Sequence, residues 1–338
     1  MIKDAPIFVV GTPRSGTTLT AQILDRHPGI MMPGENHFFE DIYSRRKEIG
    51  NAADPAVMAT IVERISTIYG RYNQVSDQQR IDRLITEEAL ISRLANGSCS
   101  YKDVLDRFME IQLEKQGKRR WGNNTPKDLF HIREILSFYP DAVILVCVRD
   151  VRDFLISYKN RWTVTTEAHK DRLKKLYHPV LTSLLWKASM KKIPALEEQI
   201  PKGNFMVIHY EDLVTDTEAV VKDICDLVGE KYVPQMLDVS TNNSSDTTAQ
   251  RGIFSSSIGK WRSSLGAEDA LIAQWITRKE MSYLGYKPES FSVRWIVVVK
   301  LILSFPFAVT KAFRANADNR GPLFQYLAKR VSAIILGR

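Results

Sequence analysis

The sequence predicts an α/β protein in which a parallel sheet is flanked by helices. Three apolar runs, at residues 7–10, 142–148 and 205–210, lack the alternation of a half-exposed strand, so each fits a strand that is buried on both faces. Helix-forming segments follow these runs, and strands that alternate with helices favour a parallel sheet. The first run also enters its helix through a turn that is bounded by Gly11 and Gly16.

This turn, GTPRSGTT at residues 11–18, predicts an anion-binding loop. The glycines permit turn conformations that other residues avoid, and the helix that opens near Ser15 directs unpaired backbone N–H groups and its positive dipole end toward the loop. The loop of a nucleotide triphosphatase reads G-x-x-x-x-G-K-[ST], whereas here Thr17 stands at the lysine position and Arg14 lies within the turn. The fold is therefore predicted to be P-loop-like, with nucleotide binding that does not use Mg²⁺. An ordinary strand-turn-helix connection is the alternative.

The segments that follow the first helix predict a turn, a crossing and a helical insertion. Residues 25–30 are expected to form the turn, and residues 31–41 to carry the chain back across the top of the first strand. Residues 40–117 are expected to be mostly helical, because apolar residues such as Ile61 and Ile65 recur at steps of three and four. We interpret them as an insertion into the domain.

The segment RRWGNNTPKDL, at residues 119–129, predicts a short strand, a turn and the start of a helix. Thr125 is the expected helix cap and Pro126 the first helical residue, where its missing N–H group costs nothing. That helix is expected to end near Tyr139, just before the second apolar run.

The second half of the chain predicts further helices, one loop and a tail. One long helix is expected to run through Leu184 and Leu196 before the third apolar run, and another over residues 218–227 after it. Residues 240–257 are rich in Ser, Thr, Asn and Asp and predict a loop, either a functional lid or plain disorder. Residues 288–338 predict an apolar and basic helical tail.

Length and composition favour one large domain, expected over residues 1–287 of the 338, with 44% hydrophobic residues. The formal net charge of +8 suits an anionic cofactor, an acidic acceptor or a membrane surface alike. Cys99, Cys147 and Cys225 show neither C-x-x-C nor zinc-site spacing, so we expect no disulfide framework, no metal site and a reducing compartment. The first strand begins at Ile7, which leaves no room for a secretory signal before it, and we expect a cytoplasmic protein.

Candidate ligand-binding residues follow the predicted strands. Ligands of parallel sheets gather at the carboxyl ends of the strands, where this sequence has Arg14, Arg149 and Tyr210. The helix after Arg149 brings Ser157 and Arg161, four residues apart, onto one face. These two residues and Arg149 are predicted to surround a second phosphate, although each alone is more commonly a surface residue. Two separate phosphate sites argue against plain ATP.

Seven ordered motifs resemble those of the sulfotransferases that use 3′-phosphoadenosine 5′-phosphosulfate (PAPS), above all the bacterial branch and the tyrosylprotein sulfotransferases. They are GTPRSGTT, GENHFF, NNTPKDL, VRDVRDFLISYKNRW, VIHYEDL, SIGKWRSSL and MSYLGY, and they extend from about residue 7 to residue 286. The first and fourth motifs are the most specific in combination.

The resemblance implies which residues hold each part of the donor. The 5′-phosphosulfate site would consist of Arg14, Ser15, Gly16, Thr17 and Thr18. The 3′-phosphate, which distinguishes PAPS from ATP, would be held by Arg149, Ser157 and Arg161. The positions that close over the nucleotide would be Tyr210, Ser245 and Lys260.

The resemblance also implies that Glu35, in GENHFF, is the general base, since a carboxylate within reach can take the proton of an attacking hydroxyl. His37 is a rival base, because it titrates nearer neutrality and would share a face with Glu35 in an extended segment. Arg14 and the helix N-terminus would stabilise the charge on the leaving phosphate oxygen during in-line displacement. Many relatives carry Lys directly before the Thr-Pro pair, where this chain has Asn124, so Lys127 is the candidate for supplying that charge.

The predicted function is therefore transfer of a sulfuryl group from PAPS to a hydroxyl of a glycan, lipid, peptide or small molecule, without a metal and without a nucleic-acid partner. A Mg²⁺-dependent kinase or NTPase is opposed by Thr17 and by Arg149, which stands where a Mg²⁺-binding Asp would follow the strand. The other alternative is a nucleotide-binding protein that is impaired in turnover, for which Asn124 is the only hint.

The tail suggests a membrane surface or a protein contact. Residues 290–338 are apolar with interspersed basic residues, which fits helices in a membrane interface and equally fits helices packed on protein. The first apolar stretch carries Lys300 and Pro306, and we expect it to be shorter than the roughly 20 residues that a membrane span requires.

Overall fold

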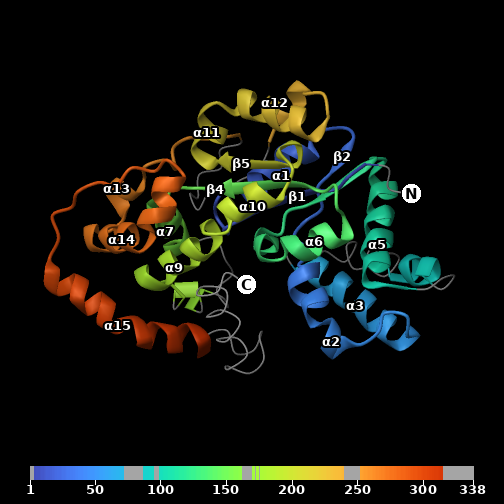
Figure 1. Ribbon diagram of the computed structural model, residues 1–338, viewed down its shortest axis with the longest axis horizontal. Coiled ribbons are helices and arrows are strands. Elements are labelled where there is room, and N and C mark those ends of the chain that lie inside the picture. The colour runs from blue at the N-terminus through green and yellow to red at the C-terminus, as the bar shows by residue number, and fades with distance from the viewer. Residues whose placement is uncertain are drawn as a thin grey trace.

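Helices cover both faces of a central sheet in the computed structural model (Figure 1), which describes residues 4–71, 87–94, 99–161, 170–171, 173–174, 176–239 and 252–314. The strands are β1 (Ile7–Gly11), β2 (Ile30–Met31), β3 (Arg120–Asn123), β4 (Val143–Val148) and β5 (Phe205–His209). Before β4 the helices are α1 (Thr17–Asp25), α2 (Arg46–Ile49), α3 (Pro55–Arg71), α5 (Tyr101–Gln116) and α6 (Ile132–Phe138), with short turns η1 (Phe38–Ile42) and η3 (Pro126–Phe130). After β4 they are α7 (Val151–Lys159), α9 (Pro179–Met190), α10 (Ile193–Gln199), α11 (Tyr210–Thr215), α12 (Thr217–Val228), α13 (Trp261–Ser264), α14 (Ala267–Tyr283) and α15 (Trp295–Arg314).

The sheet has the strand order β2-β3-β1-β4-β5, and every neighbouring pair is parallel. In the central pair, Ile7 lies opposite Val143 and Gly11 opposite Cys147. Because all five strands run the same way, their carboxyl ends share one edge of the sheet. The predicted parallel sheet flanked by helices is confirmed.

The two faces of the sheet bury separate apolar clusters, which explains why the strands show no alternation. Phe8, Val10, Ile144 and Val146 belong to one cluster, and Ile7, Val9, Val143 and Leu145 to the other. The first cluster also contains residues of α3 and α5, so the predicted insertion shares the core of the sheet.

Several local predictions differ from the structure. Helix α7 ends at Lys159, so Arg161 lies beyond the helix that was predicted to place it on one face with Ser157. The turn near residue 30 leads into β2, a strand of two residues that is too short to give a periodic signal. The single long helix predicted through Leu184 and Leu196 is wrong, because α9 ends at Met190 and α10 begins at Ile193. Pro194 lies in the first turn of α10, where a proline is tolerated, whereas inside a continuous helix it would remove a backbone hydrogen bond. Thr125 does stand at the cap position before η3, but its hydroxyl donates to Asn123 Oδ1 at 3.1 Å and makes no capping bond.

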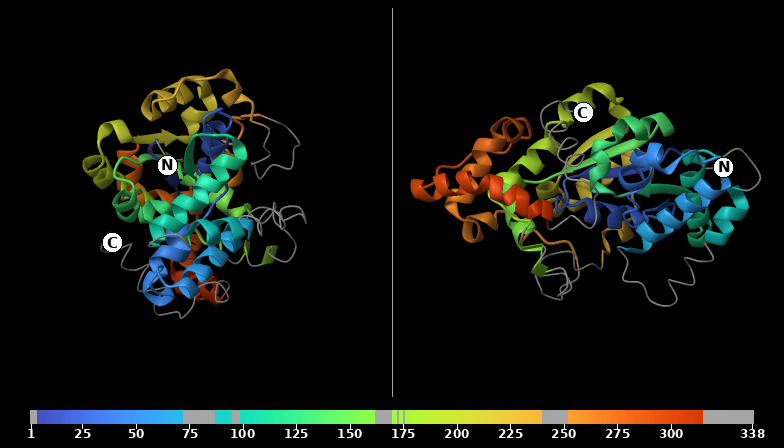
Figure 2. Two further views of the ribbon diagram at one scale, coloured as in Figure 1. Left: turned by 90° about the vertical axis from the view of Figure 1, so that its right-hand side faces the viewer. Right: turned by 90° about the horizontal axis from the view of Figure 1, so that it is seen from below.

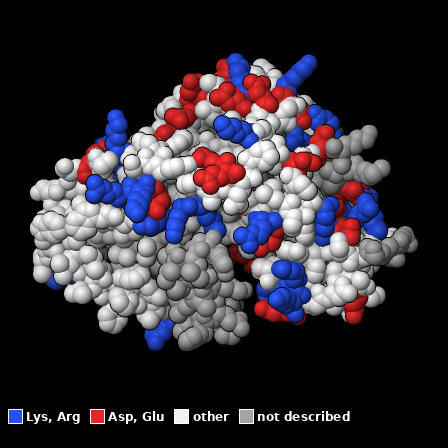
Figure 3. Space-filling model, viewed as in Figure 1, with Lys and Arg blue, Asp and Glu red and all other residues white. Residues whose placement is uncertain are grey.

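The C-terminal helices form one end of the molecule and the insertion the other (Figure 2). Helix α15 has 20 residues, and an 18-residue window within it has a mean hydropathy of 1.9. By these measures it is long and apolar enough to cross a membrane, so our expectation of a shorter stretch was wrong. Charged side chains are sparse on the surface over α15, at the lower left of Figure 3, and gather elsewhere on that face. The predicted site residue Ser245 and the tail from residue 315 lie outside the described residues.

Candidate functional site

The loop between β1 and α1 has the backbone of an anion site. Gly16, directly before α1, has φ +97°, and Arg14 has φ +74°. Residues other than glycine rarely adopt such a positive φ. The buried hydroxyls of Ser15 and Thr12 are hydrogen-bonded to each other, which fixes the turn from inside. Thr17 and Thr18 begin α1, so their backbone amides lie in the first turn, where N–H groups have no partner within the helix.

The structure brings the two predicted sets of phosphate-binding residues into direct contact. Arg14 Nε donates to Ser157 Oγ at 3.1 Å, and Arg149 Nη1 donates to the Arg14 carbonyl oxygen at 3.3 Å. Burial lowers the pKa of Arg14, and the positive charges of Arg149 and Arg161 lower it further. Arg14 therefore lies among positive charges, an arrangement that an anion would stabilise.

Several contacts fix the position of Arg149. Its Nη2 donates to the Ser257 carbonyl oxygen at 2.9 Å, its guanidinium lies 4.3 Å from the ring centroid of Tyr210, and its own carbonyl oxygen accepts a 2.9 Å bond from Trp186 Nε1. The Tyr210 hydroxyl in turn lies 2.7 Å from Ser257 Oγ. Arg149 Nε is buried and has no hydrogen-bond partner among the described residues. A buried donor without a partner is destabilising, and an anion that reached it would remove that cost.

The segment before α13 is fastened to α7. Asp153 accepts from Gly259 N at 2.7 Å and from Trp261 N at 3.0 Å, so the backbone at Lys260, between them, is held against α7. Burial raises the pKa of Asp153. We did not predict Ser257, Asp153 or Trp186 as site residues. Ser257 nevertheless begins the motif SIGKWRSSL, one of the seven motifs named above.

Arg152, which as a single residue reads like a surface side chain, is buried. Its Nε donates to Asp150 Oδ1 at 2.9 Å, and its guanidinium lies 4.1 Å from the ring of Trp261. Arg152 therefore stabilises the start of α7 and the segment beside it, rather than facing a ligand.

A second cluster contains both candidate bases. His37 Nε2 lies 2.9 Å from Glu35 Oε2, and His37 Nδ1 lies 3.1 Å from Glu40 Oε2. Glu40 also accepts from Lys127 Nζ at 2.6 Å. Burial would lower the pKa of His37, but the hydrogen bonds and charges of Glu35 and Glu40 outweigh it and raise the pKa to about 9. At neutral pH His37 is therefore an imidazolium that joins two carboxylates.

Buried polar residues of the segment 123–128 lie against this cluster. The Thr125 hydroxyl accepts from His37 N at 3.2 Å, and Asn123 Nδ2 donates to Asp128 Oδ2 at 2.6 Å. Burial raises the pKa of Asp128 well above its usual range, and Asp128 Oδ1 has no hydrogen-bond partner in the described part of the chain. Asn124, at the position where many sulfotransferases carry Lys, is also buried.

The strand order sets how the two clusters lie along the edge. Glu35 follows β2 and Lys127 follows β3, whereas Arg149 follows β4 and Tyr210 follows β5. The loop that carries Arg14 follows β1, in the middle. With about 4.8 Å between neighbouring strands, the ends of β2 and β1 are separated by about 10 Å. The carboxylate cluster of Glu35, His37 and Glu40 therefore lies on the β2 side of the anion loop, and Arg149 lies on the β4 side.

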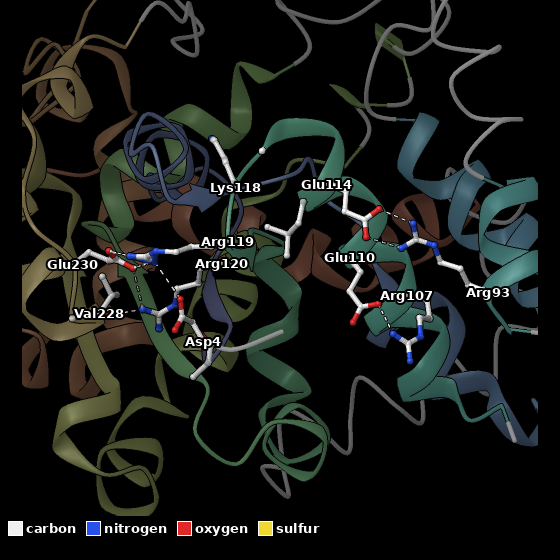
Figure 4. A pocket seen from close by; sticks show the side chains of 14 residues that line it. Asp4, Arg93, Arg107, Glu110, Glu114, Lys118, Arg119, Arg120, Val228 and Glu230 are labelled. Carbon is white, nitrogen blue, oxygen red and sulfur yellow. Dashed lines mark hydrogen bonds and ion pairs between the residues drawn. The ribbon is translucent and has the colours of Figure 1, made fainter. Parts of the chain in front are cut away.

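A cleft of about 1050 Å³ lies at the other edge of the sheet (Figure 4). Asp4, which precedes β1, and Arg119, which precedes β3, are among its lining residues. Its charges are paired with one another, as in Arg119 Nη1 to Glu230 Oε1 at 2.8 Å and Arg93 Nη1 to Glu114 Oε1 at 3.0 Å. This cleft therefore does not share the cationic character of the site at the carboxyl edge.

His37 gives a prediction for stability. Its folded pKa of about 9 exceeds the ordinary 6.5, so its contribution is complete below pH 6.5 and is lost as the pH rises through 9. We expect the free energy of unfolding to fall by on the order of 3 kcal/mol over that interval, and His37→Asn to flatten the fall. Urea titrations from pH 6 to about pH 9.5 measure both. His27, whose pKa burial lowers, is the control, because replacing it should leave the fall in place. An unchanged slope in His37→Asn would contradict the charged imidazolium.

The parallel order, the glycine-bounded loop after β1 and the arginine after β4 together define a P-loop-like α/β protein. A model of the sulfotransferase family matches residues 6–234, and the chain belongs to that family. Both the predicted fold class and the predicted family are confirmed. Among the described residues, no three His, Cys, Asp or Glu side chains gather as metal ligands.

Two relatives and two solved structures illustrate the family likeness. The chain is 30% identical over 138 residues to sulfotransferase 2A1 of Rattus norvegicus, covering 40% of this chain and 48% of that protein. It is 25% identical over 142 residues to 3-beta-hydroxysteroid sulfotransferase of Cavia porcellus, covering 40% and 47%. The chain thus spans about half the length of the curated relatives it matches.

The structures are more distant in sequence and show the fold. The sulfotransferase domain from the curacin biosynthetic pathway has a TM-score of 0.55 at 17% identity, covering 86% of this chain and 100% of that one. The sulfotransferase domain from the Synechococcus PCC 7002 olefin synthase has a TM-score of 0.54 at 19% identity, covering 84% and 96%.

Proposed function

We propose that this chain transfers a sulfuryl group from PAPS to an acceptor hydroxyl. The observation that carries the proposal is the arginine cluster: Arg14 has a pKa lowered by burial and by neighbouring positive charge, and Arg149 has a buried Nε without a partner in the described chain. Two neighbouring guanidinium groups favour a ligand with more than one phosphate, because each phosphate compensates the positive charge of one arginine.

The donor is proposed to lie along the edge from β1 to β5. The loop from Arg14 to Thr18 takes the 5′-phosphosulfate, and Arg149, Ser157 and Arg161 take the 3′-phosphate. Ser157 accepts from Arg14, and its hydroxyl can also donate its hydrogen to a phosphate oxygen. Tyr210 and Lys260 close over the nucleotide, and Ser245 remains a prediction.

Glu35 is the proposed general base. An imidazolium has no lone pair with which to accept a proton, so the raised pKa of His37 favours Glu35 over its rival. The Glu35 side chain is 28% exposed, and so an acceptor can reach it. His37 orients that carboxylate, and Lys127 supports His37 through Glu40. That Lys127 also compensates for Asn124 at the reacting centre remains a prediction.

The residues then have defined roles in one displacement. Glu35 takes the proton from the acceptor hydroxyl as the hydroxyl oxygen bonds to sulfur. The bond between sulfur and the bridging oxygen breaks, and its electron pair stays on the 5′-phosphate, where Arg14 and the amides that open α1 stabilise the charge. The products are a sulfate ester and adenosine 3′,5′-bisphosphate.

Labelled donor tests this proposal directly. The purified chain is incubated with [³⁵S]PAPS, a cell extract as the source of acceptors, and EDTA, and labelled products are identified by mass. We expect a labelled sulfate ester and stoichiometric adenosine 3′,5′-bisphosphate. Nucleotide binding without product would instead indicate a binding protein, and product formed only from ATP and Mg²⁺ would indicate a kinase.

Gly16→Ala is expected to weaken donor binding by about tenfold or more. A Cβ at this position would lie 2.8 Å from Cδ2 of Tyr210, at a backbone φ of +97° that alanine avoids. Gly229→Ala is the matched control, since Gly229 has φ +72° with nothing within 4 Å of an added Cβ. Both variants should lose about 1–2 kcal/mol of stability from the backbone. Equal nucleotide affinity in the two variants, measured by calorimetry, would remove Tyr210 from the nucleotide site.

We also propose that the enzyme works in the cytoplasm and reaches a membrane surface through residues 290–338. The apolar character of α15 and its basic residues support the membrane contact. The acceptor hydroxyl belongs to a glycan, lipid, peptide or small molecule.

A further inference from the structure

Helix α15 leaves a large apolar face uncovered. The side chains of Trp295, Ile296, Leu303 and Phe307 are 59%, 64%, 68% and 76% exposed. Val299 and Ile302 are each 47% exposed. These six residues, here called the outer face, are far more exposed than large apolar side chains in a folded domain usually are. The surface over α15 is correspondingly poor in charge (Figure 3).

The opposite side of the helix is fixed to the domain. Val298 is buried, Ser304 Oγ lies 3.1 Å from His178 Nε2, and Phe305 packs with its ring centroid 6.2 Å from that of His178. Helix α15 contacts both α9 and α14. A helix that is attached along one side exposes its other side, the outer face, to the surroundings. This arrangement suits a helix that lies in a membrane interface, and not one that crosses the bilayer alone.

Charge is arranged along one flank of the outer face. Lys300 and Lys311 are exposed and lie eleven residues apart, which is close to three full turns, so both stand on the same side of the helix. Arg314 adds a third positive charge at the end, and Trp295–Arg314 contains no Asp or Glu. Lysines beside an apolar face extend to anionic headgroups while their stems lie on hydrocarbon, whereas protein interfaces are depleted in lysine.

A tryptophan from α14 extends the outer face. Trp275 is 52% exposed, and its ring centroid lies 5.7 Å from that of Trp295. Tryptophan is enriched where a protein meets the headgroup layer. Beside this pair lies a cavity of about 240 Å³ whose lining residues are all apolar, Val180, Ile272, Trp275, Ile276, Ile302 and Phe305. Its chemistry suits part of an acyl chain.

We propose that the outer face of α15, together with Trp275, docks the enzyme in the plane of an anionic bilayer, with Lys300 and Lys311 at the headgroups. This inference rests on the proposed membrane attachment and is independent of the group that the enzyme transfers. A lipid surface is the occupant that accounts for the apolar face, the lysine flank and the tryptophan pair together.

Vesicle sedimentation of the full chain tests the docking surface. We expect binding to phosphatidylcholine vesicles that contain phosphatidylglycerol, and weaker binding to phosphatidylcholine alone or at high salt. Leu303→Ser/Phe307→Ser should weaken binding by about tenfold or more, and Lys300→Gln/Lys311→Gln should remove the preference for phosphatidylglycerol. Ile91→Ser/Phe254→Ser, at exposed apolar residues elsewhere, is the matched control and should bind like the unchanged chain.

Fluorescence quenching and oligomeric state distinguish in-plane docking from a helix that crosses the bilayer and from a dimer. Lipids brominated near the headgroup should quench the Trp295 contribution, obtained by difference from Trp295→Phe, more than lipids brominated at the chain ends. Stronger quenching at the bilayer centre would overturn in-plane docking, as would vesicle binding that the Leu303 and Phe307 changes leave intact. A dimer that those changes dissociate, without vesicle binding, would assign the face to a second copy. Nucleotide affinity is measured on the same variants and should not change, so failure of docking is distinct from failure of the proposed transfer.

Discussion

Glu35→Ala is expected to lower the rate of sulfuryl transfer by about 10²–10⁴-fold, the usual contribution of a positioned general base. The acceptor hydroxyl then has no carboxylate to take its proton, while the loop that carries Arg14 and the arginine cluster after β4 are untouched. Donor affinity should therefore stay within about twofold of the unchanged chain. Rates of adenosine 3′,5′-bisphosphate release and calorimetric titration with the bisphosphate measure the two quantities.

The control variants distinguish a base from a structural carboxylate. Glu35→Gln keeps the shape of the side chain and a hydrogen-bonding oxygen for His37, yet it should be as inactive as Glu35→Ala. Glu48→Gln, at an exposed carboxylate that pairs with Arg45, should keep full activity. Near-normal transfer in Glu35→Gln together with loss in His37→Asn would assign proton removal to the imidazole instead.

Arg149→Ala is expected to weaken adenosine 3′,5′-bisphosphate by about 10–100-fold and adenosine 5′-phosphate by much less. Hydrogen bonds between charged partners contribute roughly 1.5–3 kcal/mol each, and the proposed contact is to the 3′-phosphate alone. Arg149→Lys should recover only part of the loss, because an ammonium cannot reproduce the planar donors that reach Ser257 and the Arg14 carbonyl.

The ratio of the two affinities is the informative quantity. Removing Arg149 also loosens Tyr210 and the segment of Ser257, so a general loss of structure would weaken both nucleotides alike. Ser157→Ala is a smaller change at the same phosphate and should shift the ratio in the same direction. Arg45→Ala, at an exposed arginine, should leave both affinities unchanged. Equal weakening of the two nucleotides in Arg149→Ala and Ser157→Ala would remove this group from the 3′-phosphate site.

Local patterns in the sequence were sufficient for the centre of the fold. Strands β1 and β4 follow from unbroken apolar runs, because both of their faces are covered, and the anion loop follows from its glycines. The third run also gives a strand, but β5 lies at the edge of the sheet and only Ile208 in it is buried, so the prediction of a fully buried strand there was wrong. The positions of Arg14 and Arg149 follow in turn, since each comes directly after a strand of a parallel sheet.

Contacts between distant segments could not be predicted in this way. Arg149 and Ser257 are 108 residues apart, and Lys127 and Glu40 are 87 apart, so no periodicity connects them. Glu35 and His37 were expected on one face, but their direct bond depends on His37 adopting φ +47°, which the sequence does not signal. Strand β2 exists only because β3 pairs with it.

In the proposed complex, two neighbouring cationic groups at the carboxyl edge bind one adenosine nucleotide through its two phosphates. A crystal structure of the chain with adenosine 3′,5′-bisphosphate tests it most directly. We predict the 5′-phosphate at hydrogen-bond distance, about 2.7–3.2 Å, from Arg14 and the amides that open α1, and the 3′-phosphate equally close to Arg149 and Ser157. A nucleotide with only one phosphate at this edge, or one bound instead in the cleft beside Arg119, would contradict the account.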